Sequence, residues 1–341
     1  MTTPARPRRG PSVDELAAGC LAGDRALLAR AITLVESNRI DHQERAQELL
    51  RRLLPHTGGA RRIGITGVPG VGKSSFIEAM GSRLVDDGHK LAVLAIDPSS
   101  SRTGGSVMGD KTRMGRLSMD ERAFVRPSPS SGSLGGVARK TRETLLLCEA
   151  AGYGVVLVET VGVGQSEAMV ADMVDAVLLL LLPGAGDELQ GIKRGLLELV
   201  DVVAVNKADG DRVTAARQAR VEYASALRLV RGRRRGAPPV LVCSSQTGAG
   251  LDDVWAALEE HRGRLESSGE LAAQRQRQDL RWMWALLEDG LMARFRGHPV
   301  VADLLPRVEA SIVDGETTPT RAARRLLELF LGGGPDAGAE T

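Results

Sequence analysis

The chain contains few of the residues that build disulfide frameworks, zinc sites or aromatic cores. Cysteine occurs at three of the 341 positions, Cys20, Cys148 and Cys243. These positions are far apart and form no C-x-x-C pair. We therefore expect a reducing, cytoplasmic compartment and neither a disulfide framework nor a zinc site. Aromatic residues make up 3% of the chain, so the core must consist mainly of Leu, Val, Ile and Ala.

A large net charge and a long apolar run are also lacking. The formal net charge is +2 at pH 7, which gives no strong attraction to nucleic acid or to a membrane, so we expect neither as a partner. The longest apolar run, 176–182, is far shorter than the ~20 residues of a membrane span, and it predicts a buried central strand. The polar N-terminus predicts no signal peptide.

The order of the apolar segments predicts an α/β fold. Strands and helices alternate, and several strands are continuously apolar, as expected when helices cover both faces of a sheet. This pattern predicts a doubly wound, mostly parallel sheet. The predicted strands are 61–66, 91–96, 123–126, 155–159, 176–182, 201–206 and 240–244. The predicted helices between them are 74–86, 137–151, 166–173, 188–199, 211–229 and 251–262.

Helical segments flank this domain on both sides. We expect a disordered N-terminus (1–11), an N-terminal helical extension (12–58), a nucleotide-binding domain (59–265), a C-terminal helical region (266–331) and a flexible tail (332–341). Pro299 and Pro306 are expected to break the C-terminal helices, and Arg231–Pro239 is expected to be a solvated loop. The periodicity leaves two roles open for the helix that bears Trp282 and Trp284, a cover for the core or an arm of a dimer.

A phosphate-binding motif gives the strongest functional signal. The segment Gly67-Val-Pro-Gly-Val-Gly-Lys-Ser74 fits G-x-x-x-x-G-K-[ST] at every fixed position, between an apolar strand and a helical run. Its glycines let backbone N–H groups turn toward phosphate oxygens at the positive end of a helix dipole. We expect Lys73 to reach the β- and γ-phosphates and the Ser74 hydroxyl to ligate Mg²⁺. The residues expected to bind the nucleotide here are Gly67, Val68, Pro69, Gly70, Val71, Gly72, Lys73, Ser74 and Ser75.

A second motif predicts which base is bound. Asn206-Lys-Ala-Asp209 follows an apolar strand and matches N-K-x-D. The Asp209 carboxylate can accept hydrogen bonds from the ring N–H and the exocyclic amine of guanine, a pair of donors that adenine lacks. The motif therefore favours GTP over ATP. Asn206 is expected to bond the base edge and to tie strands together, and the stem of Lys207 to lie along the base. Ser244, Ser245 and Gln246, in the next strand-end loop, resemble the last guanine-contact loop of GTPases.

The residues for hydrolysis are expected after another buried strand. Glu159-Thr-Val-Gly162 stands where most GTPases have D-x-x-G. We expect Glu159 to hold a water of the Mg²⁺ shell and the Gly162 N–H to meet the γ-phosphate. Many GTPases carry a water-orienting Gln directly after this Gly, whereas here the residue is Val163 and Gln165 follows later. With no arginine finger identifiable from sequence, slow intrinsic hydrolysis is predicted, about 10⁻⁴ s⁻¹, until a partner completes the site.

Together these motifs resemble the MeaB/ArgK family of P-loop GTPases, the chaperones of adenosylcobalamin-dependent acyl-CoA mutases. E-x-x-G in place of D-x-x-G, beside N-K-x-D, is typical of a class that also contains the metal-insertion GTPases of hydrogenase and urease maturation. Further matching segments are 95–101, 104–114, 126–129, 159–166 and 183–193. The layout matches the family from about residue 12 to 330, and 59–265 then becomes the GTPase domain.

The resemblance assigns roles to three more regions. It implies that Asp97 and Asp110, in switch I, belong to the Mg²⁺ shell, and that 159–166 is switch II. It implies that a further switch, 184–193, contacts the mutase. Lys193 in that segment is a candidate for stabilising the developing phosphate charge. It also implies a homodimer held by the C-terminal helices, which favours the dimer arm.

The function implied is GTP hydrolysis that gates delivery of intact adenosylcobalamin to a mutase, such as methylmalonyl-CoA mutase, and removal of damaged cofactor. The adenosyltransferase of that mutase is a further candidate partner. A metal-insertion GTPase is one alternative, but it needs clustered Cys and His ligands, and the five histidines here are dispersed. A kinase of a transport-system binding protein is another, but no base beside a hydroxyl acceptor is recognisable. The intact phosphate loop argues against a purely structural helical scaffold.

Overall fold

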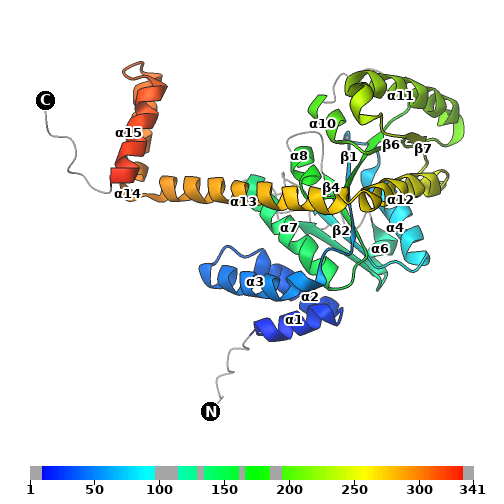
Figure 1. Cartoon of the computed structure of the whole chain (residues 1–341), viewed down its shortest axis with the longest axis horizontal. Coiled ribbons are helices and arrows are strands. Elements are labelled where there is room, and N and C mark those ends of the chain that lie inside the picture. The colour runs from blue at the N-terminus through cyan, green and yellow to red at the C-terminus, as the bar shows by residue number, and fades with distance from the viewer. Residues whose placement is uncertain (1–9, 97–113, 129–133, 161–165, 185–193, 333–341) are drawn as a thin grey trace, which may run out of the picture. The chain divides into compact units, whose positions relative to one another are not determined.

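The computed structural model describes residues 10–96, 114–128, 134–160, 166–184 and 194–332 (Figure 1). The chain forms two compact units that divide after Gln278. The first unit contains the sheet and the N-terminal helices. The second contains the rest of a long helix and the two helices that follow it.

Seven parallel strands form one sheet in the order β3-β2-β4-β1-β5-β6-β7. The chain order reverses beside β1, which is where open α/β sheets bind ligands at the carboxyl ends of their strands. All seven strands predicted from the apolar runs are confirmed. Their bounds are β1 (Arg61–Gly67), β2 (Leu91–Ile96), β3 (Ala123–Ser128), β4 (Val155–Thr160), β5 (Ala176–Leu181), β6 (Val202–Val205) and β7 (Val240–Val242).

Helices cover both faces of this sheet, which confirms the doubly wound α/β fold. On one face, Ile63 and Ile65 of β1 share a core with Phe76 of α4 and Leu251 of α12. On the other face, Gly64 lies against α8, because successive strand residues point to opposite sides. The helices of this unit are α4 (Lys73–Asp86), α6 (Gly115–Met119), α7 (Leu134–Ala150), α8 (Ser166–Ala171), α10 (Arg194–Leu199), α11 (Val213–Arg235) and α12 (Leu251–Ser267), with a 3₁₀ turn η2 (Gly210–Arg212). Part of the predicted helix 188–199 lies outside the described residues.

Three N-terminal helices pack beside α7. They are α1 (Val13–Leu21), α2 (Arg25–Val35) and α3 (Ile40–Leu53), followed by the 3₁₀ turn η1 (Leu54–His56). Ser12 and Glu15 form a capping box at the start of α1. Asp24 caps α2 through bonds from the N–H groups of Ala26 and Leu27, at 2.8 and 3.0 Å. Local capping chemistry therefore sets where α1 and α2 begin, whereas α3 has no side-chain cap.

The C-terminal helices are α13 (Glu270–Gly297), α14 (Pro299–Val313) and α15 (Pro319–Gly332). Val301 and Val308 of α14 form a small core with Ala322 and Leu326 of α15. Pro299 occupies the first turn of α14, where no intrahelical N–H bond is needed. Pro306 lies inside α14, so the prediction that it breaks the helix is wrong. Packing against α15 outweighs the single backbone bond that proline removes.

The basic run 231–239 is not a loop along its whole length. Helix α11 continues to Arg235, and Gly236 follows with φ +64°. Arginine is a good helix former, and cationic residues at the last turn are favoured by the helix dipole. The loop prediction is therefore wrong for the part of the run up to Arg235.

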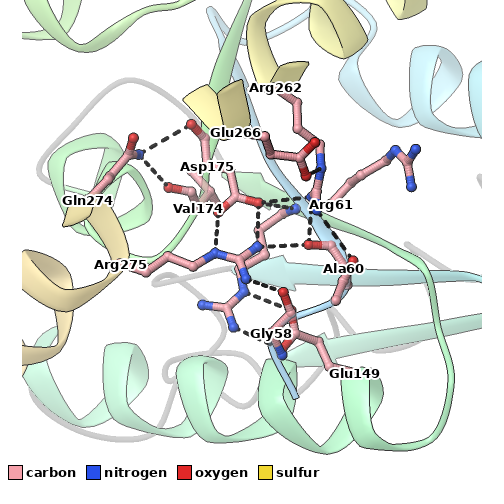
Figure 2. A network of polar contacts seen from close by, with 12 residues as sticks. Gly58, Ala60, Arg61, Glu149, Val174, Asp175, Arg262, Glu266, Gln274 and Arg275 are labelled. Atoms are coloured by element: carbon pink, nitrogen blue, oxygen red, sulfur yellow. Dashed lines mark hydrogen bonds and ion pairs between the residues drawn. The ribbon is translucent and has the colours of Figure 1, made fainter. Parts of the chain in front are cut away.

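A polar network fixes the starts of β1 and β5 to α12 and to the first turns of α13 (Figure 2). Asp175, just before β5, accepts two bonds from the guanidinium of Arg275, at 2.8 and 2.7 Å. The carbonyl oxygen of Ala60, just before β1, accepts from Arg262 at 2.9 Å and from Arg275 at 2.8 Å. Asp175 is buried, and a buried carboxylate is tolerated when it is paired in this way. None of the described helices is both long enough and apolar enough to cross a membrane.

Candidate nucleotide-binding site

The phosphate loop lies where β1 ends and α4 begins, at the carboxyl edge of the sheet (Figure 1). Gly67 has φ +152° and Gly72 has φ +93°. A Cβ atom at Gly67 would lie 2.5 Å from the carbonyl oxygen of Leu180, and one at Gly72 would lie 3.1 Å from Nδ2 of Asn206. The backbone conformation favours glycine at both positions, and at Gly67 the close approach of the Leu180 carbonyl oxygen also excludes a side chain. Val71 is buried below the loop, whereas Pro69, Gly70 and Ser75 are exposed.

The ammonium group of Lys73 is held over its own loop. Its Nζ donates to the carbonyl oxygen of Gly67 at 2.7 Å and to that of Val68 at 3.2 Å. The side chain is buried. A buried cation at the positive end of α4 makes this loop a strong site for an anion such as a polyphosphate.

Two of the predicted metal ligands are brought together. The Ser74 hydroxyl donates to Oε1 of Glu159 at 3.0 Å, from the start of α4 to the end of β4. Glu159 is buried, and the neighbouring Thr160 hydroxyl donates to that of Thr66 at 3.1 Å. Hydroxyl and carboxylate oxygens are the hard ligands that Mg²⁺ prefers, so this pair fits the predicted metal site. Among the described residues no group of three or more metal ligands assembles, and Asp97 and Asp110 lie outside them.

Asn206 joins the phosphate loop to the base loop. Its Nδ2 donates to the carbonyl oxygen of Val71 at 2.9 Å. Its Oδ1 accepts from the backbone N–H and the hydroxyl of Ser245, at 3.1 and 2.9 Å. The side chain is 1% exposed. These contacts join the phosphate loop after β1 to the loop after β7, and the bond of Asn206 to the base edge stays a prediction.

Asp209 is held in position by two donors. The Ser244 hydroxyl donates to Oδ2 at 2.7 Å, and Nη2 of Arg212 donates to Oδ1 at 2.7 Å. The bond from Ser244, aided by Arg212, holds the pKa of Asp209 below its usual value although desolvation opposes this. The carboxylate is therefore ionised at neutral pH, and each oxygen keeps a second lone pair for the guanine N–H groups.

Lys207 and Gln246 complete the base side of the site. Lys207 has φ +58°, the one non-glycine residue with positive φ in the described part of the chain. Its Nζ donates to the carbonyl oxygen of Gly70 at 2.6 Å, so the lysine stem spans from the base loop to the phosphate loop. The backbone N–H of Gln246 donates to the Ser244 hydroxyl at 3.3 Å. This bond orders the turn on which Ser244 and Ser245 lie.

Several predicted residues cannot be placed, and two supporting residues were missed. Gly162, Gln165 and Lys193 lie outside the described residues, so their roles stay predictions. Arg83 of α4 donates to the carbonyl oxygen of Gly248 at 2.9 Å and links the phosphate-loop helix to the base loop. No sequence motif marks Arg83. The position of Arg212, three residues after Asp209, was a short-range signal that could have been used.

The fold and this site define a P-loop GTPase. A family model described as "Methylmalonyl Co-A mutase-associated GTPase MeaB" matches residues 28–300. The chain is 49% identical to the "GTPase ArgK" of Escherichia coli, over 90% of this chain and 93% of that protein. It is 48% identical to the "Methylmalonic aciduria type A homolog, mitochondrial" of Mus musculus, over 93% of this chain and 79% of that protein.

A solved structure supports the same assignment. The crystal structure of a "LAO/AO transport system kinase" matches with a TM-score of 0.76 and 37% sequence identity, over 96% of this chain and 100% of that one. The chain therefore belongs to the MeaB family of GTPases. The resemblance first drawn from the motifs is confirmed.

Replacing Asn206 with alanine is expected to lower both stability and nucleotide affinity. The change leaves the carbonyl oxygen of Val71 and the donors of Ser245 without their partner, and an orphaned buried polar group costs about 1–3 kcal/mol. Thermal unfolding and GTP titration would measure both effects. Asn38→Ala, at the one other asparagine of the chain, whose side chain is exposed, is the matched control. Equal GTP affinity in the two variants would contradict the bridging role.

Proposed function

We propose that this GTPase is a nucleotide-dependent chaperone of an adenosylcobalamin-dependent acyl-CoA mutase. The single observation that carries the proposal is the match of residues 28–300 to a family described by its association with methylmalonyl-CoA mutase. In this proposal the GTP state gates cofactor delivery and removal of damaged cofactor. We propose that the further switch, 184–193, contacts the mutase. The adenosyltransferase of that mutase is proposed as a second partner.

The arrangement of the site supports phosphoryl transfer to water, without a covalent intermediate. Lys73 is held where its ammonium can neutralise charge on the β- and γ-phosphates, and the loop N–H groups orient them. Ser74 would hold Mg²⁺ and Glu159 would hold one of its waters, and the bound ion would neutralise further charge on the phosphates. Asp209, held by Ser244, orients the guanine. Positioning and electrostatics then account for the chemistry.

The C-terminal region, 266–331, is proposed as a homodimer arm. Leu280, Trp284, Leu287 and Leu291 are 59%, 61%, 47% and 60% exposed. Their spacing along α13 places them on one helix face, as in the apolar seam of a coiled coil. Exposed apolar stripes of this kind mark protein–protein contacts. The exposure favours the dimer arm over a cover for the core of this chain.

Mutase affinity in each nucleotide state tests the proposal. If nucleotide and mutase binding are coupled, a candidate mutase should bind about 5–150-fold differently with GDP and with a non-hydrolysable GTP analogue, because typical coupling has this size. Calorimetric titrations with methylmalonyl-CoA, isobutyryl-CoA and 2-hydroxyisobutyryl-CoA mutases measure it. If the protein bound each of the three mutases with the same affinity in the presence of GDP, in the presence of the analogue and without nucleotide, the proposed chaperone function would be contradicted.

A kinase is the alternative to be tested beside it, because a similar solved structure carries that name. GTP labelled at the γ-phosphate, incubated with a transport-system binding protein, separates the two functions. We expect label in free phosphate and none on the acceptor protein. Label on the acceptor, absent with the Lys73→Ala variant, would establish the kinase instead.

A further inference from the structure

The turn that follows β7, 244–250, is closed around Ser244 by its own backbone bonds. The N–H of Ser244 donates to the carbonyl oxygen of Ala249, and the N–H of Gly248 donates to that of Ser244, both at 2.9 Å. The Ser244 hydroxyl in turn holds the Asp209 carboxylate at 2.7 Å. A change in the shape of this turn therefore moves the group that orients the predicted guanine contact.

The first half of this turn is held from the side of β6. Oδ1 of Asn206 accepts from the N–H and the hydroxyl of Ser245, at 3.1 and 2.9 Å. Asp209, three residues after Asn206, accepts from Ser244. Among the described residues of the turn, these two side chains bond to none beyond Ser245. The second half, 246–249, is therefore held by other contacts.

The second half is held by a guanidinium group of α4. Nη1 of Arg83 donates to the carbonyl oxygen of Gly248 at 2.9 Å, and Nη2 donates to Oδ2 of Asp252, in the first turn of α12, at 2.5 Å. Gly248 has φ +79°, and a Cβ atom there would lie 3.2 Å from Nη1 of Arg83, so the guanidinium packs closely on the turn. The N–H of Leu251 is a more distant donor to the same oxygen, at 3.4 Å. In the part of the chain that the structure describes, no other side chain from outside the turn bonds to 246–249.

Helix α4 is a rigid support for this contact, because one of its faces is buried in the core. Phe76, Met80 and Leu84 belong to the core cluster that also contains residues of β1 and α12. Close packing of this kind leaves the helix little freedom to move. The same helix begins at Lys73, in the phosphate loop. Arg83, about three helical turns beyond Lys73, therefore fixes the base turn to the element that carries the phosphate loop.

We propose that Arg83 is a positioning residue for guanine recognition. Its guanidinium bonds to Gly248 and Asp252, neither of which is a predicted nucleotide contact. It holds the closed form of the turn, and this form places the Ser244 hydroxyl where it orients Asp209. Arg83 thus acts on the base through Ser244. The proposal rests on GTP binding and does not depend on the mutase.

Kinetics of the Arg83→Met variant test this proposal. Methionine keeps much of the apolar stem but removes both donors. We expect KM for GTP to rise about 5–10-fold, the size expected from losing one hydrogen bond, while kcat stays within about twofold because the phosphate loop is unchanged. Direct GTP titration should give the same rise in Kd. Arg116→Met is the matched control, because it removes the ion pair of Arg116 with Asp86, also on α4, at 2.6 Å, and it should keep both constants.

A double-mutant cycle with Ser244→Ala gives a second readout. If Arg83 acts through Ser244, Arg83→Met should change KM less than about twofold once the Ser244 hydroxyl is absent, whereas two independent contacts would add their effects. Thermal unfolding establishes that each variant is folded at the assay temperature. Arg83→Gln, whose side chain is too short to reach Gly248, carries the test if Arg83→Met does not fold. An unchanged KM, a rise of the same size in Arg116→Met, or additive effects in the cycle would overturn the positioning role.

Discussion

GTP hydrolysis by the Lys73→Ala variant is expected to be slower by about 10³-fold, because removing one group that stabilises transition-state charge costs ~10²–10³-fold in rate. The other side chains of the loop, those of Val68, Pro69, Val71 and Ser74, carry no charge, so none of them can take the place of Lys73. Single-turnover release of phosphate, with the variant in excess over GTP and at a concentration above its Kd for GTP, measures the loss.

The control for Lys73 must remove a positive charge without touching the loop. Lys90→Ala serves this purpose, because Lys90 is exposed and lies just before β2. It should hydrolyse GTP at the unchanged rate. If the hydrolysis rate of Lys73→Ala stayed within threefold of that of Lys90→Ala, the hypothesis that Lys73 stabilises transition-state charge would be wrong.

The Asp209→Asn variant is expected to lose its preference for GTP over ATP and to accept xanthosine triphosphate. The substitution replaces an acceptor by a donor, and xanthine carries an oxygen where guanine carries its exocyclic amine. Sites that hydrogen-bond a substrate group can discriminate by ~10⁴-fold, so a change of this order in the GTP-to-ATP affinity ratio is expected. Competition titrations with the three nucleotides measure it.

Asp211→Asn is the matched control for Asp209. Asp211 is exposed in η2, so its substitution makes the same chemical change outside the base loop and should leave selectivity as it was. In Asp209→Asn the side-chain oxygen of the introduced amide can still accept from Ser244, so a general loss of folding is not expected. Retained GTP selectivity in Asp209→Asn would show that another residue reads the base.

Whether a feature could be predicted from the sequence depends on how far apart along the chain the residues that determine it lie. The seven strands were predicted from sequence, because strand periodicity is set by neighbours along the chain. The break predicted at Pro306 and the loop predicted for the whole of 231–239 were wrong, for different reasons. At Pro306 the local signal opposed a helix, and packing against α15 decided the outcome. In 231–235 the helix propensity of arginine was itself a local signal, and the loop prediction gave it too little weight.

What the sequence by itself determined is the chemistry of the site. Gly67–Ser74 and Asn206–Asp209 each form a compact motif whose function needs only a few consecutive residues at strand ends. What the tertiary structure alone decided is how these motifs are joined. Asn206 bonds Val71 across 135 residues, and Gln278 bonds Val174 across 104. Contacts of such separation arise from sheet order and helix packing, and no local spacing encodes them.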